Sequence, residues 1–436
     1  MAKRKARASS KGGGEQRVSS SFEDLMTAAL ERGDDTFETG RYLVTYKENA
    51  QGESAKSLKA MGLRVADARD YTDQAASLAD LGDADGLFLP EIGVAVVGGE
   101  ALRSRGLSLQ EEIAGDSPIE VIEPEHFVFA ANDRDRYLRG FRRAAQAIEE
   151  DLRSAEEAAL EEEFETAVLG ATWGLVACKV PPSSRSGLAI KTAVLDTGFD
   201  LGHPDFVGRA IVSATFVGQP VQDLHGHGTH VAGTAMGPQS PAGSTPRYGI
   251  AYRAPMFIGK VLRNDGWSVG GSVLAGMNWA IANRCPVINM SLGAQTGVQA
   301  AYTAAGTSAL NNGLLIIAAA GNHGPGPTGA PANSPTIMAV ASVDKNLRHS
   351  SFSAVGKIEI AGPGRDVFSS MPRPTRYGTM SGTSMATPHV AGCAALWAQT
   401  SGTLRGMTLW RKLQATARPL LDPPAKIGKG LVQAPA

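Results

Sequence analysis

The sequence predicts a small ferredoxin-like α+β unit followed by a larger α/β domain, in which a mainly parallel sheet carries helices on both faces. The 436 residues are too many for one ordinary core, and 43% of them are apolar, so more than one core can be buried. Before residue 131, strand-like and helix-like segments follow the order β-α-β-β-α-β. After residue 171, short apolar runs alternate with helical stretches, which is typical of parallel sheets.

Residues 1–40 have the composition of a disordered basic tail. The opening stretch MAKRKARASSKGGGEQ is rich in Lys, Arg, Ser and Gly, and no apolar segment typical of a secretion signal follows it. One short helical pattern, SFEDLMTAALERG at 21–33, interrupts the tail. We therefore expect a cytoplasmic protein, with export by a non-Sec route left open.

The ferredoxin-like unit is predicted for residues 41–131. Its expected strands are 41–47, 86–99 (one or two strands) and 119–130, and its expected helices are 54–62 and 101–115. Together these segments give the alternation of strands and helices on which the fold prediction depends.

A charged segment at 132–170 separates the two units. Its apolar residues recur every three or four positions, which predicts a helix. Arginines crowd the first half of this stripe and glutamates the second. We interpret it as a solvated linker helix, with a partner-binding helix as the alternative.

The α/β domain is predicted for residues 171–436. The apolar runs expected to be its strands are 191–196, 254–262, 286–293, 313–322 and 336–343. Asp196 closes the first run, Ser291 lies near the end of the third, and Asn322 closes the fourth. Because functional groups gather at the carboxyl ends of parallel strands, these polar residues are candidates for a site.

Three histidines, His225, His227 and His230, lie within the stretch DLHGHGTHVAG. Histidine is a frequent metal ligand and also a frequent general base at neutral pH. The local sequence leaves a metal site, a catalytic base and simple packing all open.

Two other glycine-flanked stretches suggest nucleophilic catalysis. AVLDTGFD delivers Asp196 from a buried strand into a turn, and GTSMATPHVAG places Ser384 just before a helix-like segment. Backbone N–H groups at a helix start can stabilise an anion. A catalytic hydroxyl needs a base within reach and an acid that orients the base, and the order here is Asp196, His227, Ser384.

These motifs together resemble the subtilisin family of serine proteases (subtilases, peptidase family S8). WGL at 173–175 and GKGLVQA at 428–434 extend the resemblance over 172–436. It implies a subtilisin-like three-layer fold and a serine endopeptidase that hydrolyses peptide bonds in proteins through an acyl-enzyme on Ser384. In that family the remaining triad members would be Asp196 as the acid and His227 as the base.

The resemblance also implies residues that bind the substrate. Asn322 in AAAGN matches the family's oxyanion-hole asparagine. An extended peptide would lie between two strands, which are carried here by Ser291, Leu292 and Gly293 on one side and by Gly266, Trp267 and Ser268 on the other. His323 would face the mouth of the first specificity pocket.

Residues 41–131 resemble the family's propeptide, a chaperone and inhibitor whose last strand occupies the active-site cleft. The chain would then be a zymogen inhibited in cis by this prodomain, with self-cleavage near Ala130–Asn132. The charged segment at 132–170 departs from the family pattern, in which propeptide and protease are almost contiguous. This departure, with the missing secretion signal, also motivates an alternative: a maturation protease or peptide transferase with one dedicated partner.

No cofactor is expected for catalysis. Asp205 matches a ligand of the family's structural calcium, but the stretch 235–249, where further ligands would lie, lacks the expected asparagine. His230, His389 and Cys393 are expected to be structural, with Cys393 a buried thiol, and His225 is expected in a loop.

Composition restricts the partners. The net charge of −1 gives no general attraction to nucleic acid or to an anionic membrane, and the longest apolar runs are far too short to cross a bilayer. The three cysteines have no CxxC spacing and form no disulfide framework. We expect protein or peptide substrates and a monomer. A non-catalytic binding module and a metal-dependent hydrolase are less favoured alternatives.

Overall fold

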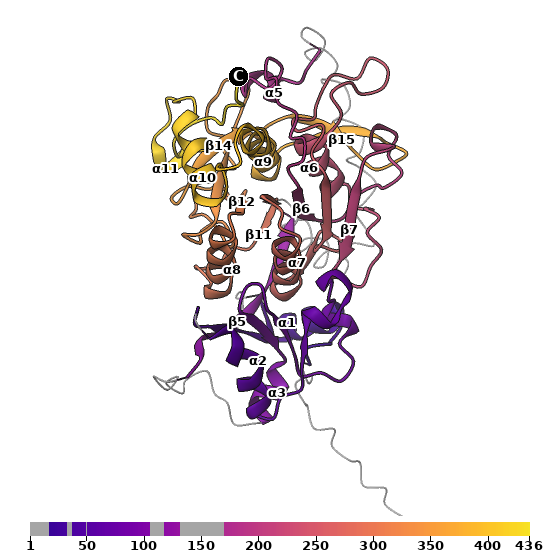
Figure 1. Ribbon diagram of the computed structural model, residues 1–436, viewed down its shortest axis with the longest axis vertical. Helices are drawn as coiled ribbons and strands as arrows, with labels where there is room; N and C mark the ends of the chain where they lie inside the picture. The colour runs from indigo at the N-terminus through magenta and orange to yellow at the C-terminus, as the bar shows by residue number, and fades with distance from the viewer. Residues whose placement is uncertain (1–16, 33–36, 49, 105–116, 131–169) are drawn as a thin grey trace, which may run out of the picture.

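The computed structural model describes residues 17–32, 37–48, 50–104, 117–130 and 170–436 (Figure 1). The predicted linker helix at 132–170 lies outside these ranges except for its last residue. In the part of the chain that is described, no helix is long and apolar enough to cross a membrane.

The N-terminal unit has the predicted ferredoxin-like topology. Its elements are β1 (Glu38–Tyr46), α2 (Gln51–Ala60), β2 (Val65–Asp67), the 3₁₀ turns Ala68–Asp70, Thr72–Gln74 and Leu78–Asp80, β3 (Gly86–Leu89), β4 (Val94–Val97), α3 (Gly99–Ser104) and β5 (Ile119–Ala130). Strands β5, β1, β4 and β3 lie side by side and antiparallel, and the short β2 pairs with the edge of β3.

The prediction of a disordered tail for residues 1–40 is wrong for Phe22–Arg32 and from Glu38 on, whereas the short helix predicted at 21–33 is confirmed. Phe22–Arg32 form helix α1, and β1 already begins at Glu38. The apolar side chains of α1 recur at helical spacing and are buried; they are Phe22, Leu25, Met26 and Ala29. Helix α1 is therefore ordered by packing, and composition alone could not reveal the surface that it covers.

The larger domain contains a parallel sheet of seven strands in the order β14-β13-β12-β10-β6-β8-β7. The strands are β6 (Thr192–Asp196), β7 (Ile211–Thr215), β8 (Met256–Lys260), β10 (Val287–Met290), β12 (Leu315–Ala319), β13 (Met338–Val343) and β14 (Ile360–Pro363). All their pairings are parallel, as predicted.

Helices cover both faces of this sheet (Figure 1). Helices α6 (His227–Met236) and α9 (Thr383–Thr400) pack on one face, and α7 (Gly270–Ala282) and α8 (Ala300–Asn311) pack on the other. Successive residues of one strand enter opposite cores: Leu195 lies with α7 and α8, whereas Val194 lies with α6 and α9. This three-layer arrangement is the predicted fold class.

The remaining elements complete the domain. They are α5 (Trp173–Ala177), the 3₁₀ turn Pro204–Phe206, β9 (Trp267–Val269), β11 (Leu292–Gly293), β15 (Val367–Ser370), β16 (Tyr377–Met380), α10 (Gly406–Thr416) and α11 (Pro424–Ile427). Strands β15 and β16 form a hairpin-like antiparallel pair.

The two units are joined by strand pairing. The last residues of β5 leave their own sheet and lie between β9 and β11 of the larger domain. Phe129 pairs with Trp267 on one side and with Gly293 on the other, and both pairings are antiparallel. The end of the N-terminal unit thus occupies a slot between two short strands of the larger domain.

Candidate active site

Asp196 and His227 form the first half of the candidate site. Asp196 is the last residue of β6, and His227 is the first residue of α6. Nδ1 of His227 lies 2.7 Å from Oδ1 of Asp196, and both side chains are buried. Because a carboxylate can only accept, Nδ1–H donates this bond, and Nε2 remains as the basic nitrogen of the ring.

The turn before α6 is fixed by a second buried carboxylate, Asp223. Its oxygens accept hydrogen bonds from backbone N–H groups of His225, Gly226 and Thr229. They also accept from the hydroxyls of Thr197 and Thr229. Asp223 therefore satisfies the N–H groups at the start of α6 and ties that helix to the residue after Asp196. We did not predict this role, although an acidic residue just before a helix start is its usual signal.

Lys260 is a further buried charge beside Asp196 that we did not predict. It is the last residue of β8 and pairs in register with Asp196. Its ammonium group donates to the backbone carbonyl of Thr197 and, at 2.8 Å, to Oδ1 of Asn264. Burial lowers the pKa of Lys260 to about 8, while the charges of Asp223 and Asp196 oppose this shift. Lys260 thus gives partial charge balance to the two carboxylates.

Ser384 lies in the first turn of α9, directly after Gly382 and Thr383. Its Oγ donates to the backbone carbonyl of Ser291 at 3.0 Å, and Oγ of Ser291 donates to the backbone carbonyl of Ser384 at 2.8 Å. Pro388 stands four residues after Ser384 and has no N–H, so the helix cannot supply a donor to that carbonyl. The Ser291 hydroxyl takes the place of the missing donor.

Asn322 follows β12 and is oriented by the start of α9. Its Oδ1 accepts from the backbone N–H of Thr383 at 2.8 Å and from the Thr383 hydroxyl at 2.9 Å. Since a backbone N–H can only donate, the atom facing it must be the amide oxygen. The Nδ2 amino group is therefore the donor end of Asn322, as an oxyanion hole requires.

Neighbouring strand ends bring these residues to one edge of the sheet. Asp196 ends β6, Ser291 follows the adjacent β10, and Asn322 follows β12, the next strand. His227 is bonded to the first of these residues and Ser384 to the second. The edge therefore carries a hydroxyl, a histidine oriented by a carboxylate, and an oriented amide donor.

The six residues predicted to bind substrate all lie beside the end of β5. Strands β9 and β11 contain four of them, Trp267, Ser268, Leu292 and Gly293. The carbonyl of Gly266 accepts from the N–H of Ala130 at 2.7 Å, and Ser291 directly precedes β11. The structure thus places an extended segment of its own chain where the resemblance expects a peptide.

The remaining histidines are not arranged as one metal site. Nε2 of His230 bonds the carbonyl of Val367 at 2.8 Å, and burial lowers the pKa of His230 to about 3. His389 bonds the carbonyl of Met385 at 2.8 Å, and burial lowers its pKa to about 4. Both are structural, as predicted.

His225 and His323 lie outside the buried core. His225 is half-buried in the loop before α6, with its ring 6.2 Å from that of His227. His323 bonds the carbonyl of Pro327 at 2.8 Å through Nε2. The role of His323 in specificity stays a prediction. Cys393 is buried, as expected for a core thiol.

The surroundings of Asp205 do not fit a calcium ion. Its Oδ2 accepts from the hydroxyl of Tyr248 at 2.5 Å, and both its oxygens accept from Tyr377 at 3.0 and 3.1 Å. Calcium takes six to eight oxygen ligands, several of them usually carboxylates. Among the described residues, no group of three or more His, Cys, Asp or Glu could hold a metal ion. Two phenols instead satisfy this carboxylate.

Comparison with known proteins agrees with this geometry. The sequence model of the Subtilase family matches residues 187–430, which is more than half of the chain. Subtilisin NAT of Bacillus subtilis subsp. natto is 38% identical over 275 residues, covering 61% of this chain and 70% of that protein. Subtilisin Savinase of Lederbergia lenta is 39% identical over 270 residues, covering 61% and 97%.

Subtilisin DY of Bacillus licheniformis is similar to the same extent, with 37% identity over 265 residues, 59% of this chain and 94% of that protein. The matched region contains the parallel sheet and the residues at its carboxyl edge. The chain belongs to the subtilase family and is a subtilisin-like serine endopeptidase.

Proposed function

We propose that the protein hydrolyses peptide bonds through an acyl-enzyme on Ser384 and is made as a zymogen inhibited by its own N-terminal unit. The observation that carries the catalytic part is the 2.7 Å bond between His227 and Asp196, which leaves Nε2 as the base. The observation that carries the inhibitory part is the position of β5 between β9 and β11.

The chemistry follows from the oriented groups. Ser384 Oγ attacks the scissile carbonyl while Nε2 of His227 takes its proton, and Asp196 stabilises the resulting imidazolium. Nδ2 of Asn322 and the N–H of Ser384 stabilise the negative oxygen of the tetrahedral intermediate. His227 then gives the proton to the departing amine. Water hydrolyses the ester by the same steps, with His227 again acting as base.

Two glutamates of β5 hold the N-terminal unit on the protease domain. The carboxylate of Glu123 accepts from the backbone N–H groups of Ala300 and Ala301, at the start of α8. Oε1 of Glu125 accepts from the N–H of Gly271 at 2.6 Å, at the start of α7. A negative charge at a helix start satisfies N–H groups that the helix cannot and is favoured by the helix dipole.

Glu125 is also the centre of a buried ion pair. Arg41 of β1 donates to both of its oxygens, with Nε 2.6 Å from Oε2 and Nη2 3.1 Å from Oε1, and both side chains are almost fully buried. Breaking a buried pair by removing one partner is costly, typically about 3–5 kcal/mol. The ion pair therefore links the folding of the N-terminal unit to the hydrogen bond that Glu125 accepts at the start of α7.

Helix α1 adds a contact that lies outside the ferredoxin-like unit. The Phe22 ring packs edge-on against Trp267 of β9 at 6.0 Å, and Arg263 lies over both rings. Glu23 accepts from Arg263 at 2.5 Å. In this arrangement α1 packs against β9, the strand that pairs with β5, and so strengthens inhibition.

The register of β5 supports a proposal for where the chain would be cut. Ala130 pairs with Leu292, so the next residue of a peptide in this register meets Ser291, which is bonded to Ser384. The bond exposed to the nucleophile would then follow Ala131. Ala131 and Asn132 lie outside the described residues, and we propose this cleavage site from the register alone.

Labelling with a fluorophosphonate, which forms a covalent bond with activated serines, tests the catalytic proposal. The wild-type chain is expected to be labelled at Ser384 once the N-terminal unit has been released. Ser384→Ala should not be labelled, and His227→Ala should be labelled far more slowly because it lacks the base. Equal labelling of the wild type and Ser384→Ala would contradict the assignment of the nucleophile.

A further inference from the structure

Tyr302 of α8 carries a hydroxyl that no other part of the described chain satisfies. The side chain is buried, and its oxygen has no hydrogen-bond partner in the structure. Leaving a buried hydroxyl unpaired costs about 1–3 kcal/mol, so such groups are rare and each needs a physical explanation. None of the catalytic groups uses Tyr302.

The hydroxyl lies under β5, in the slot that a substrate would occupy. A Cβ atom built on Gly270 would lie 3.5 Å from Tyr302 Oη and 3.5 Å from the carbonyl oxygen of His126 in β5. One turn before Tyr302, Gln299 contacts the same strand through His126 Nδ1 at 3.2 Å. The side of α8 that carries Tyr302 therefore faces the backbone of the bound segment.

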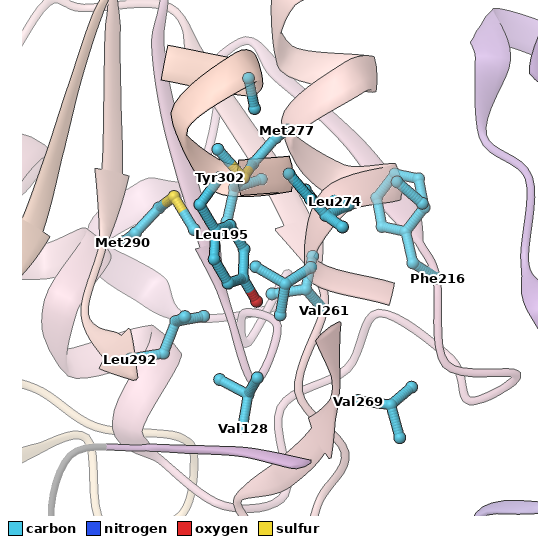
Figure 2. Close-up of a cluster of buried hydrophobic side chains, with 14 of the residues drawn as sticks. Val128, Leu195, Phe216, Val261, Val269, Leu274, Met277, Met290, Leu292 and Tyr302 are labelled. Carbon is cyan, nitrogen blue, oxygen red and sulfur yellow. The ribbon is translucent and has the colours of Figure 1, made fainter. Parts of the chain in front are cut away.

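Val128 of β5 points toward this hydroxyl. It is opposite Ser268 in the pairing with β9 and is 2% exposed. Figure 2 shows its two methyl groups directed between Leu292 and Val269, toward the end of Tyr302 that carries the oxygen. These side chains belong to one buried cluster. A valine side chain fills this space but offers the hydroxyl nothing to bond.

The charged groups near Tyr302 are acidic. The carboxylates of Glu125 and Glu123 raise the pKa of Tyr302 further, beyond the large increase that burial causes, so the phenol stays protonated at any ordinary pH. Both carboxylates are already bonded to the starts of α7 and α8. Tyr302 is thus a neutral donor and acceptor without a partner, in a slot that binds extended chains.

We propose that Tyr302 makes the protease select a hydrogen-bonding side chain, threonine over valine, at the fourth residue before the cleaved bond. This inference rests on the proposed function, because it takes β5 as the guide to how substrate lies. Threonine and valine have nearly the same shape, so packing does not separate them. The hydroxyl of a threonine at this position forms a hydrogen bond with the hydroxyl of Tyr302. A valine at this position forms no such bond and displaces the water that the phenol can bond when the slot is empty.

The choice of valine in the N-terminal unit follows from the same logic. An inhibitor that carries the less favoured residue at this position is held mainly by its glutamates and is released more readily after cleavage. Substrates with threonine then compete well against the released segment.

A two-by-two comparison tests the proposal. Two peptides that differ only by threonine or valine at the fourth position are cleaved by self-processed wild type and by self-processed Tyr302→Phe, with active sites counted by fluorophosphonate. In wild type, kcat/KM should favour threonine about tenfold, and in Tyr302→Phe the preference should vanish or turn to valine. The same ratio in both enzymes would overturn the proposal.

A second comparison needs no proteolysis and separates this inference from the proposed function. In the full-length Ser384→Ala chain, Val128→Thr should raise the melting temperature when Tyr302 is present and lower it in Tyr302→Phe. If this coupling is found but neither peptide is cut, the proposed function fails and the contact stands. If Val128→Thr has the same effect in both backgrounds, the Tyr302 proposal is wrong, whatever the activity.

Discussion

Ser291 and Ser384 exchange two hydrogen bonds, each hydroxyl donating to the backbone carbonyl of the other residue at 3.0 and 2.8 Å. These bonds join the end of β10 to the first turn of α9, at Ser384, the proposed nucleophile. The exchange depends on Pro388, which leaves the carbonyl of Ser384 without a donor within the helix. Ser291, which we predict to bind the substrate backbone, is thus also bonded to the proposed nucleophile.

Ser291→Ala removes the donor to a buried carbonyl. We expect the free energy of unfolding to fall by about 1–3 kcal/mol and kcat to fall about tenfold, because the start of α9 can shift. Adding Pro388→Ala supplies a backbone N–H at the right place and should restore much of both losses. Urea unfolding and steady-state kinetics check this, and a double variant no better than Ser291→Ala would contradict it.

Asn322→Ala removes the side-chain donor of the proposed oxyanion hole. Turnover should fall about 10²–10³-fold with little change in KM, because the bond forms mainly in the transition state. Thr383→Val is the matched control: it keeps the amide but removes one of its two orienting donors, so its loss should be much smaller. Similar losses in kcat for the two variants would count against this division of roles.

Glu123→Gln weakens the hold of β5 on the start of α8. The change removes a charge that favours the helix dipole, and the contact with the N–H groups of Ala300 and Ala301 becomes weaker. We expect the full-length Glu123→Gln variant to gain peptidase activity faster than the full-length wild type. Glu120→Gln, an exposed position on the same strand, is the control and should activate at the wild-type rate. The prediction is wrong if both variants activate alike.

Two buried histidines make the fold sensitive to acid. The pKa of His230 is lowered to about 3 and that of His389 to about 4, below the ordinary value of about 6.5 for an unfolded chain. Unfolding therefore takes up protons between these values. The stability that these residues contribute is complete above pH 6.5 and is lost as the pH falls toward 4 and 3.

Between pH 7 and pH 5, each of these histidines should lower the free energy of unfolding by about 2 kcal/mol. Urea unfolding of the Ser384→Ala chain at the two pH values measures the total, without self-digestion. In His389→Gln, the drop in stability from pH 7 to pH 5 should be smaller by about 2 kcal/mol. An unchanged drop would mean that His389 is not buried in its neutral form.

The sequence could predict those features that depend on local pattern. The strand predicted at 119–130 is β5 with the same bounds, and Asp196, Ser291 and Asn322 do lie at neighbouring strand ends. Asp196, His227 and Ser384 are predicted as a triad from the resemblance that the glycine-flanked motifs carry, because few residue types serve in that chemistry.

The contacts that depend on distant parts of the chain could not be predicted. The pattern at 21–33 predicts helix α1, but it does not predict the packing of this helix against Trp267, more than two hundred positions away. The hydrogen bonds between Ser291 and Ser384 could be predicted only by knowing which backbone carbonyl lacks a donor. The two tyrosines around Asp205 are likewise brought together only by the fold, where a sequence match suggested calcium.

We propose that Ser384 cuts a chain that lies in the register of β5. Intact-mass analysis of purified wild type and Ser384→Ala, with sequencing of the new termini, tests this proposal. We predict that wild type is cut after Ala131 and that Ser384→Ala stays whole. A wild-type chain that remains uncut under conditions where it takes up fluorophosphonate, or the same cut in Ser384→Ala, would contradict the claim.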